Sequence, residues 1–220
     1  LFRSENMNET HEDNHQLLIS AHPIFGLPST KIYWFETVQK INKHHKKQPR
    51  ILVIASCGIF LIEKKTFPRS LVISRIIAYN ELVLICADEN SMQFFKPKVT
   101  MNLQHPRYLE AVALVVAIRK AMYQGEFPRP PKFAFLPQIQ ASVDKAVSSL
   151  NMEKKINALA DRFLSLCLLE PVESLQTEQV GNVYNKLKDN PKSVDFDMAS
   201  ISPQLISAMA TAVACDKNVS

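Results

Sequence analysis

The stretch that decides the fold is RILVIASCGIFLIEK, residues 50–64. It contains two short apolar runs, residues 50–56 and residues 58–64, that are rich in β-branched side chains, as strands usually are. Only the corner Ser56-Cys57-Gly58 separates the two runs, which is the spacing of a tight hairpin. The stretch therefore predicts two adjacent antiparallel strands.

The flanking sequence extends this sheet in both directions. The preceding segment, residues 31–42 (KIYWFETVQKIN), alternates well enough to predict a first strand, with Tyr33 and Phe35 on one face. Three further β-rich runs follow the hairpin, at residues 70–77, 81–87 and 91–96. This succession predicts a small curved sheet.

The hydrophobic period then changes from 2 to 3.6 and predicts a helix over residues 106–124. Pro106 stands at its first position and Gly125 just past its end, the usual start and stop asymmetry. We expect Val112, Val115 and Ile118 to face the sheet. A sheet plugged by a helix is the shape of a binding module rather than a catalytic one.

The second half of the chain has a different organisation. Residues 127–137 are Pro-rich and predict an extended linker, and residues 138–189 carry helical periodicity. A short alternating strand at residues 190–198 and a helix at residues 202–215 follow, and the pattern restarts at Asn218. One strand plus one helix in about 28 residues is the unit of a long leucine-rich repeat.

Residues 31–124 resemble a pleckstrin-homology (PH) domain, through the hairpin RILVIAS/GIFLIEK, the strands RSLVISR, ELVLICAD and SMQFF, and the C-terminal helix. With the Pro-rich link, the helical segment and the repeat start, the chain resembles the N-terminal part of the CARMIL family. That family comprises cytosolic scaffolds that regulate actin-capping protein at membranes. Its capping-protein-binding segment lies far C-terminal to the part that this sequence resembles.

The expected fold class is α+β: a PH-like β-barrel capped by its C-terminal helix, a helical linker or cap, and the start of a leucine-rich repeat solenoid. The expected domains are a partly disordered leader (1–30), the PH-like domain (31–126), the linker (127–137), the helical cap (138–189) and the first repeat (190–220).

Positive charge is concentrated in the middle of the chain. Residues 31–132 contain 17 Lys and Arg against 7 Asp and Glu, whereas residues 1–30 contain 1 against 4 and residues 133–220 contain 8 against 10. This distribution predicts one surface that faces a polyanion, with an anionic membrane leaflet or an acidic protein as partner.

The densest basic run lies between the first two expected strands, at residues 40–50 (KINKHHKKQPR), without a carboxylate from Glu36 to Glu63. In PH-like domains that bind phosphoinositides this loop holds the phosphates. The candidate lipid- or anion-binding residues are Lys40, Lys43, His44, His45, Lys46, Lys47 and Arg50. Phosphoinositide-binding PH domains carry a basic residue, any residue and then Arg on the second strand. Lys47-Gln48-Pro49-Arg50 has a different spacing, so we expect diffuse attraction rather than a headgroup pocket. An ordinary solvated loop is the alternative.

Other chemistry finds little support in the sequence. His44 and His45 are adjacent and lack a nearby Cys, Asp or Glu, so a metal site is not expected. The pair Asp195 and Asp197 is expected on an exposed repeat strand rather than in a catalytic dyad. Four scattered glycines cannot form a phosphate-cradling loop, and no nucleophile motif is present. We expect neither an enzyme nor a cofactor.

Four cysteines far apart in apolar contexts indicate a reduced, cytosolic protein. The leading hypothesis is a non-enzymatic scaffold at the cell cortex that binds anionic membrane peripherally, for a regulator of the actin cytoskeleton. Further protein partners are expected through the repeats, together with a possible homodimer, but no nucleic acid. The alternative is a structural subunit of a cytoskeletal or axonemal assembly that docks on an acidic protein or filament surface without lipid.

Overall fold

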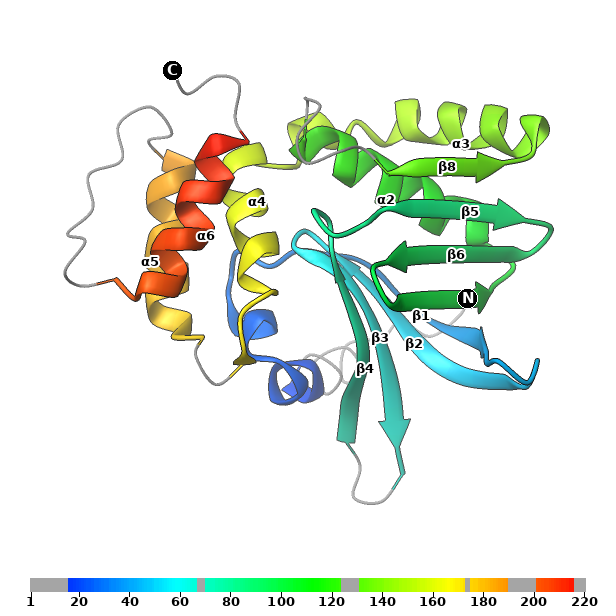
Figure 1. Cartoon of the computed structure of the whole chain (residues 1–220), viewed down its shortest axis with the longest axis horizontal. Coiled ribbons are helices and arrows are strands. Elements are labelled where there is room, and N and C mark those ends of the chain that lie inside the picture. The colour runs from blue at the N-terminus through cyan, green and yellow to red at the C-terminus, as the bar shows by residue number, and fades with distance from the viewer. Residues whose placement is uncertain (1–15, 67–69, 124–130, 173–174, 190–200, 216–220) are drawn as a thin grey trace, which may run out of the picture.

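The computed structural model describes residues 16–66, 70–123, 131–172, 175–189 and 201–215. The fold is α+β, as predicted, with one eight-stranded sheet and helices on both of its sides (Figure 1). The strands are β1 (Ile32–Ile41), β2 (Lys47–Ala55), β3 (Gly58–Lys65), β4 (Ser70–Ala78), β5 (Leu84–Asp88), β6 (Ser91–Lys96), β7 (Val99–Gln104) and β8 (Lys132–Phe135). The helices are α2 (Tyr108–Met122), α3 (Pro137–Leu150), α4 (Ala158–Cys167), α5 (Thr177–Asp189) and α6 (Pro203–Ala214), with 3-10 turns η1 (Pro23–Gly26) and η2 (Met152–Lys154).

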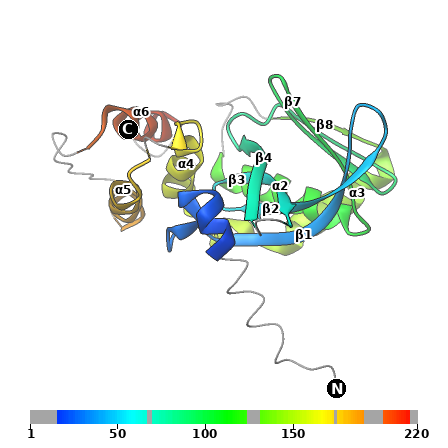
Figure 2. The same cartoon turned by 90° about the horizontal axis from the view of Figure 1, so that it is seen from below.

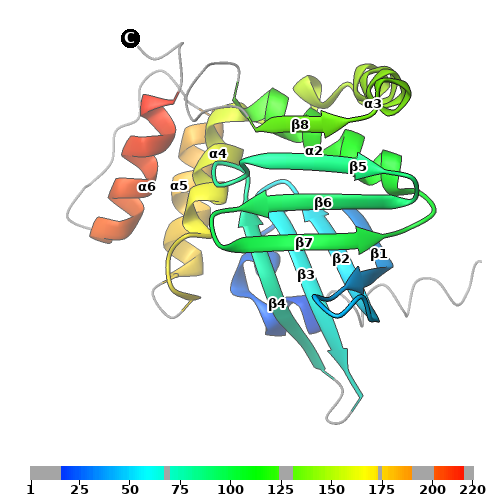
Figure 3. The ribbon, with the colours of Figure 1, turned by 45° about the vertical axis from the view of Figure 1, so that its right-hand side comes forward.

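The strand order is β4-β3-β2-β1-β7-β6-β5-β8. Neighbouring strands are antiparallel except β5 and β8, which are parallel. Figure 3 shows β5, β6 and β7 crossing over β1 to β4. The sheet therefore folds into a first layer, β1 to β4, and a second layer, β5 to β8. Strands β4 and β8 stay at opposite ends of this order. The described strands therefore form an open sheet and not the closed barrel that the sequence predicted.

The β2–β3 hairpin forms as predicted, with Ile54 opposite Ile59 across the corner. Residues 51–55 of β2 and residues 58–62 of β3 are buried on both faces of the sheet. Leu52 packs into a core shared with α2, whereas its neighbour Val53 packs into a second core shared with α4. This is why the run at residues 51–55 is continuously apolar instead of alternating.

Helix α2 fills the concave side of the sheet. Val112, Val115 and Ile118 are fully buried in the core that this helix shares with the sheet, as predicted. The helix is two residues shorter at each end than the expected span of residues 106–124.

Helices α4, α5 and α6 lie together on one side of the molecule (Figures 1 and 2). Helix α4 meets the sheet, where Ser165 Oγ accepts the N–H of Tyr79 at 2.9 Å, and α5 and α6 pack on α4. Arg162 of α4 fastens this group to the rest. Its buried guanidinium donates to the main-chain oxygen of Met122 at 2.6 and 3.2 Å and to that of Ala212 at 2.8 Å. A cation at the last carbonyls of two helices is favoured by their dipoles.

Part of the expected leader is a folded part of the core. Residues 16–21 are helical, η1 follows, and Leu18, Ile24 and Phe25 are buried in the outer core. Within the expected leader over residues 1–30, residues 16–30 are ordered, and their apolar side chains cover β3. Residues 1–15 lie outside the described part.

The segment expected to be a Pro-rich linker (residues 127–137) contributes a strand. Lys132–Phe135 forms β8, which pairs in parallel with β5, and the N–H of Lys132 donates to Val83 O at 3.0 Å. Pro137 then starts α3 directly. At least this part of the segment belongs to the sheet and does not act as a spacer.

Two further differences concern element boundaries. Within the helical segment expected over residues 138–189, η2 is separated from α4, because Asn157 caps a new helix by accepting the N–H of Ala160 at 3.1 Å. Strand β7 was not predicted. The repeat strand with Asp195 and Asp197 lies outside the described residues, so only α6 of the expected repeat is seen.

Candidate anion-binding surface

The tip of the β1–β2 hairpin is built around Asn42. The side-chain oxygen of Asn42 accepts the N–H groups of His44 at 2.9 Å and Lys46 at 3.0 Å. His45 takes a positive φ of 58° at the turn, a conformation that is uncommon outside glycine. The turn is thus organised by local hydrogen bonds, and the basic run is displayed at one end of the sheet.

The candidate residues divide into two groups. Lys43, His44, His45, Lys46 and Lys47 are all exposed at the tip. Lys40 and Arg50 lie farther along β1 and β2 and are only partly exposed. Residues two apart in a strand point to the same face. Lys40 therefore shares a face with Val38, and Arg50 shares a face with Leu52, and both of these apolar residues face the core filled by α2. The structure therefore gathers five candidates at the tip and places two at the open end of the concave face.

Charges on the concave face interact with one another. Arg50 forms an ion pair with Glu63 of β3 at 3.1 Å. The pKa of Lys40 is lowered, first by burial and then by the positive charges of Arg75 and Arg50, while Glu63 opposes the shift. Three cations from three strands thus lie close together with one carboxylate.

Arg75 of β4 was not identified from the sequence. It stands opposite Leu61 across a bulge in the β3–β4 pairing, so simple alternation along β4 does not assign its face reliably. Lys64 and Lys65 were also missed, although they are exposed and follow Glu63 directly at the end of β3. The pairing of β2 with β3 brings that end of β3 toward the β1–β2 tip. Their place at the end of a predicted hairpin strand was a usable signal.

The described residues contain no group of three His, Cys, Asp or Glu side chains that could hold a metal ion. All four cysteines are free thiols. No helix in the described ranges is long and apolar enough to cross a membrane. The surface offers ammonium, guanidinium and imidazole groups, which can attract anions.

Comparisons with known proteins add little. No family model and no curated protein matches the chain. The hSac2 domain from human phosphoinositide phosphatase Sac2 aligns with a TM-score of 0.40 and 9% identity, over 62% of this chain and 90% of that chain. A likeness at this TM-score carries no argument about fold or function.

Proposed function

We propose that the chain is a PH-like, non-enzymatic scaffold module that binds anionic membrane surfaces peripherally through the β1–β2 tip. The observation that carries the proposal is the tip itself. Lys43, Lys46 and Lys47 are exposed together with two histidines, on a turn held in shape by Asn42.

The expected strength follows from the charges. A Lys or Arg near an anionic leaflet contributes about 1 kcal/mol. Three tip lysines, with Lys64 and Lys65 nearby, can give useful attraction without a shaped pocket.

The concave face favours diffuse binding over recognition of one headgroup. Arg50 is engaged by Glu63 at 3.1 Å, and only 14% of its side chain is exposed. A carboxylate so close to Arg50 would repel a polyphosphorylated headgroup at that position. We therefore expect little preference among phosphoinositide isomers.

The proposed cellular setting is an actin-regulatory scaffold of the CARMIL type. Its support is the order of elements: seven strands, a helix in the concave side of the sheet, and then a group of helices. The proposed setting rests on this order of elements alone and does not depend on lipid binding.

Sedimentation with vesicles containing phosphatidylserine tests the lipid contact. The variant Lys43→Gln/Lys46→Gln/Lys47→Gln should lose most binding, and wild-type binding should weaken steeply with salt because exposed charges are screened over about 8 Å at physiological ionic strength. The matched control is Lys154→Gln/Lys155→Gln/Lys188→Gln, which removes three exposed lysines elsewhere. Equal binding by both variants would remove the tip from the mechanism and favour docking on an acidic protein.

A further inference from the structure

A second basic feature lies far from the tip. A cavity of about 400 Å³ opens where the segment before β1 meets η2, the start of α4 and the end of α5. It is lined by four lysines: Lys31, Lys154, Lys155 and Lys188. Among the described residues that line it, none is acidic and none is a histidine.

The cavity is a separate site from the tip. Lys31 precedes β1 and the tip follows its end, and a strand of ten residues spans roughly 30 Å. Figures 1 and 2 also show α5 and the β1–β2 tip at opposite sides of the molecule.

The wall of the cavity is polar and leaves hydrogen-bonding groups available. The Ser29 hydroxyl, which belongs to the lining, is buried and has no hydrogen-bond partner. Lys31 Nζ donates to the main-chain oxygen of Lys155 at 3.1 Å, and an ammonium has two further N–H donors. None of the four lysines forms an ion pair with a carboxylate in the described part of the chain.

One negative charge lies behind the wall. The buried carboxylate of Asp161 accepts the N–H of Asn157 at 2.9 Å and the hydroxyl of Tyr184 at 3.1 Å. Lys31 and Lys188 are close enough that their charges lower its pKa against the effect of burial. The charges of these two lysines thus also stabilise the carboxylate of Asp161. Four lysines against one carboxylate still leave the cavity strongly positive.

We infer that this cavity binds a small molecule that carries two or more phosphate groups. Its volume lies within the range of about 300–1,000 Å³ that is typical of ligand sites. Ammonium groups and hydroxyls suit phosphate oxygens, and polar atoms make up the larger share of the lining. The inference goes beyond the proposed function, because it concerns other residues and another class of ligand.

Isothermal titration calorimetry of the full chain at physiological salt tests this inference, with inositol hexakisphosphate as the probe. We expect saturable one-to-one binding, and none for unphosphorylated inositol. The variant Lys154→Gln/Lys155→Gln/Lys188→Gln should weaken binding at least tenfold. The tip variant Lys43→Gln/Lys46→Gln/Lys47→Gln, with the same loss of charge, should change it less than twofold.

All substituted lysines are exposed, so thermal melts should confirm that both variants fold. If the cavity variant melts early, the single change Lys155→Gln replaces it, with an expected loss of at least threefold. The absence of saturable binding, or equal weakening by the cavity and tip variants, would overturn the inference.

The source of the phosphate is identified in a second arm. Vesicles containing phosphatidylinositol bisphosphate that compete with inositol hexakisphosphate would indicate a lipid headgroup. Failure to compete, with calorimetric binding retained, would indicate a soluble ligand. Phosphatidylserine vesicles separate the two proposals, because their binding depends on the tip and not on the cavity.

Discussion

The two layers of the sheet differ in how many of their faces are covered. In β2 and β3, ten residues from Ile51 to Ile62, excluding the corner Ser56-Cys57, are buried without interruption. In β6 and β7, buried residues alternate with partly or fully exposed ones. A continuous apolar strand requires a cover on each side, whereas an alternating strand requires only one. The N-terminal segment and α4, whose side chains share the outer core with β2 and β3, are therefore part of the first layer's fold.

The largest expected effect comes from placing charge on either face of the first layer. Leu52→Asp and Val53→Asp should each destabilise the protein by more than about 4 kcal/mol, because each puts an unpaired carboxylate in a core. In β6, Met92→Asp should do the same, but its neighbour Gln93→Asp should cost under about 1 kcal/mol. Urea unfolding measures all four.

The informative variant of this set is Val53→Asp. A stability near wild type would mean that the outer core formed by the N-terminal segment and α4 does not cover β2 in solution, and the contrast between the layers would disappear.

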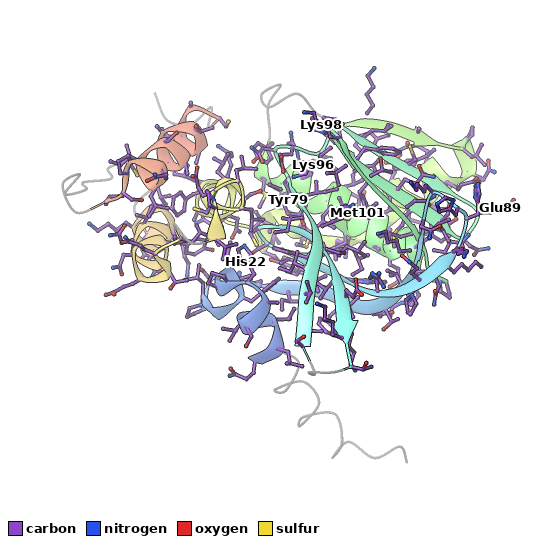
Figure 4. The ribbon with its side chains drawn as sticks, turned by 60° about the horizontal axis from the view of Figure 1, so that its bottom comes forward. His22, Tyr79, Glu89, Lys96, Lys98 and Met101 are labelled. Carbon is purple, nitrogen blue, oxygen red and sulfur yellow. The ribbon has the colours of Figure 1, made fainter. Side chains whose placement is uncertain are left out.

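The second effect concerns two ionisable groups buried in the outer cover. Burial raises the pKa of Asp161 from 3.8 to about 6 and lowers the pKa of His22 from 6.5 to about 4. Figure 4 labels His22 beside the N-terminal helical segment, next to α4. Asp161 contributes stability that is present below pH 3.8 and is lost as the pH rises through 6. His22 contributes stability that is present above pH 6.5 and is lost as the pH falls through 4.

The two contributions oppose each other between pH 4 and 6, each with a magnitude of about 3 kcal/mol. Asp161→Asn should leave the His22 contribution alone, so stability should fall as the pH drops from 6.5 to 4. His22→Asn, which keeps an acceptor for the N–H of Ile24, should show the opposite trend. Urea unfolding at pH 7, 5 and 4 measures both slopes. Parallel pH profiles for the two variants would contradict the prediction.

The third effect tests how closely α4 approaches the first layer. A Cβ at Gly58 would lie 2.6 Å from Leu168 Cδ1 and 2.9 Å from the main-chain oxygen of Ile77. Because the backbone of β4 would have to shift, Gly58→Ala should destabilise by about 1–3 kcal/mol.

Gly181→Ala is the matched control for this prediction. A Cβ there meets only Leu27 Cδ2 at 3.6 Å, and the position is helical, so the change should stabilise by about 0.5–1 kcal/mol. If both glycine variants melt alike in calorimetry, the contact between β3, β4 and α4 is looser than described.

The difference between the layers also explains what the sequence could predict. The run at residues 50–64 predicted the hairpin, because its pairing is local and its corner is short. Helix α2 and its position against the sheet were predicted from the spacing of Val112, Val115 and Ile118, which places them on one face of a helix. Strand β7 (VTMNLQ) was missed although it alternates, with Met101 and Leu103 buried between polar residues.

Features that depend on distant pairing could not be predicted. The segment KFAF at residues 132–135 becomes β8 only because β5 offers a free edge 48 residues earlier in the chain, as in the pair Leu84 and Lys132. Arg75 joins Lys40 and Arg50 only through three strand pairings and a bulge. The basic tip is local in sequence, and it remains a predicted binding surface. The four-lysine cavity combines segments separated by more than 120 residues and gave no sequence signal.

The smallest expected effect lies on β8, the strand at one end of the sheet order. Phe133 of β8 is 47% exposed, and its ring centroid lies 5.7 Å from that of Phe135. Phe133→Ala should therefore destabilise by no more than about 1 kcal/mol, from the loss of one exposed aromatic pair. Phe60→Ala in the first layer should cost about 3–5 kcal/mol, since that ring is fully buried 4.7 Å from Phe25. Paired urea titrations give both values on one scale, and a cost at Phe133 as large as that at Phe60 would mean that the β8 edge is covered in solution.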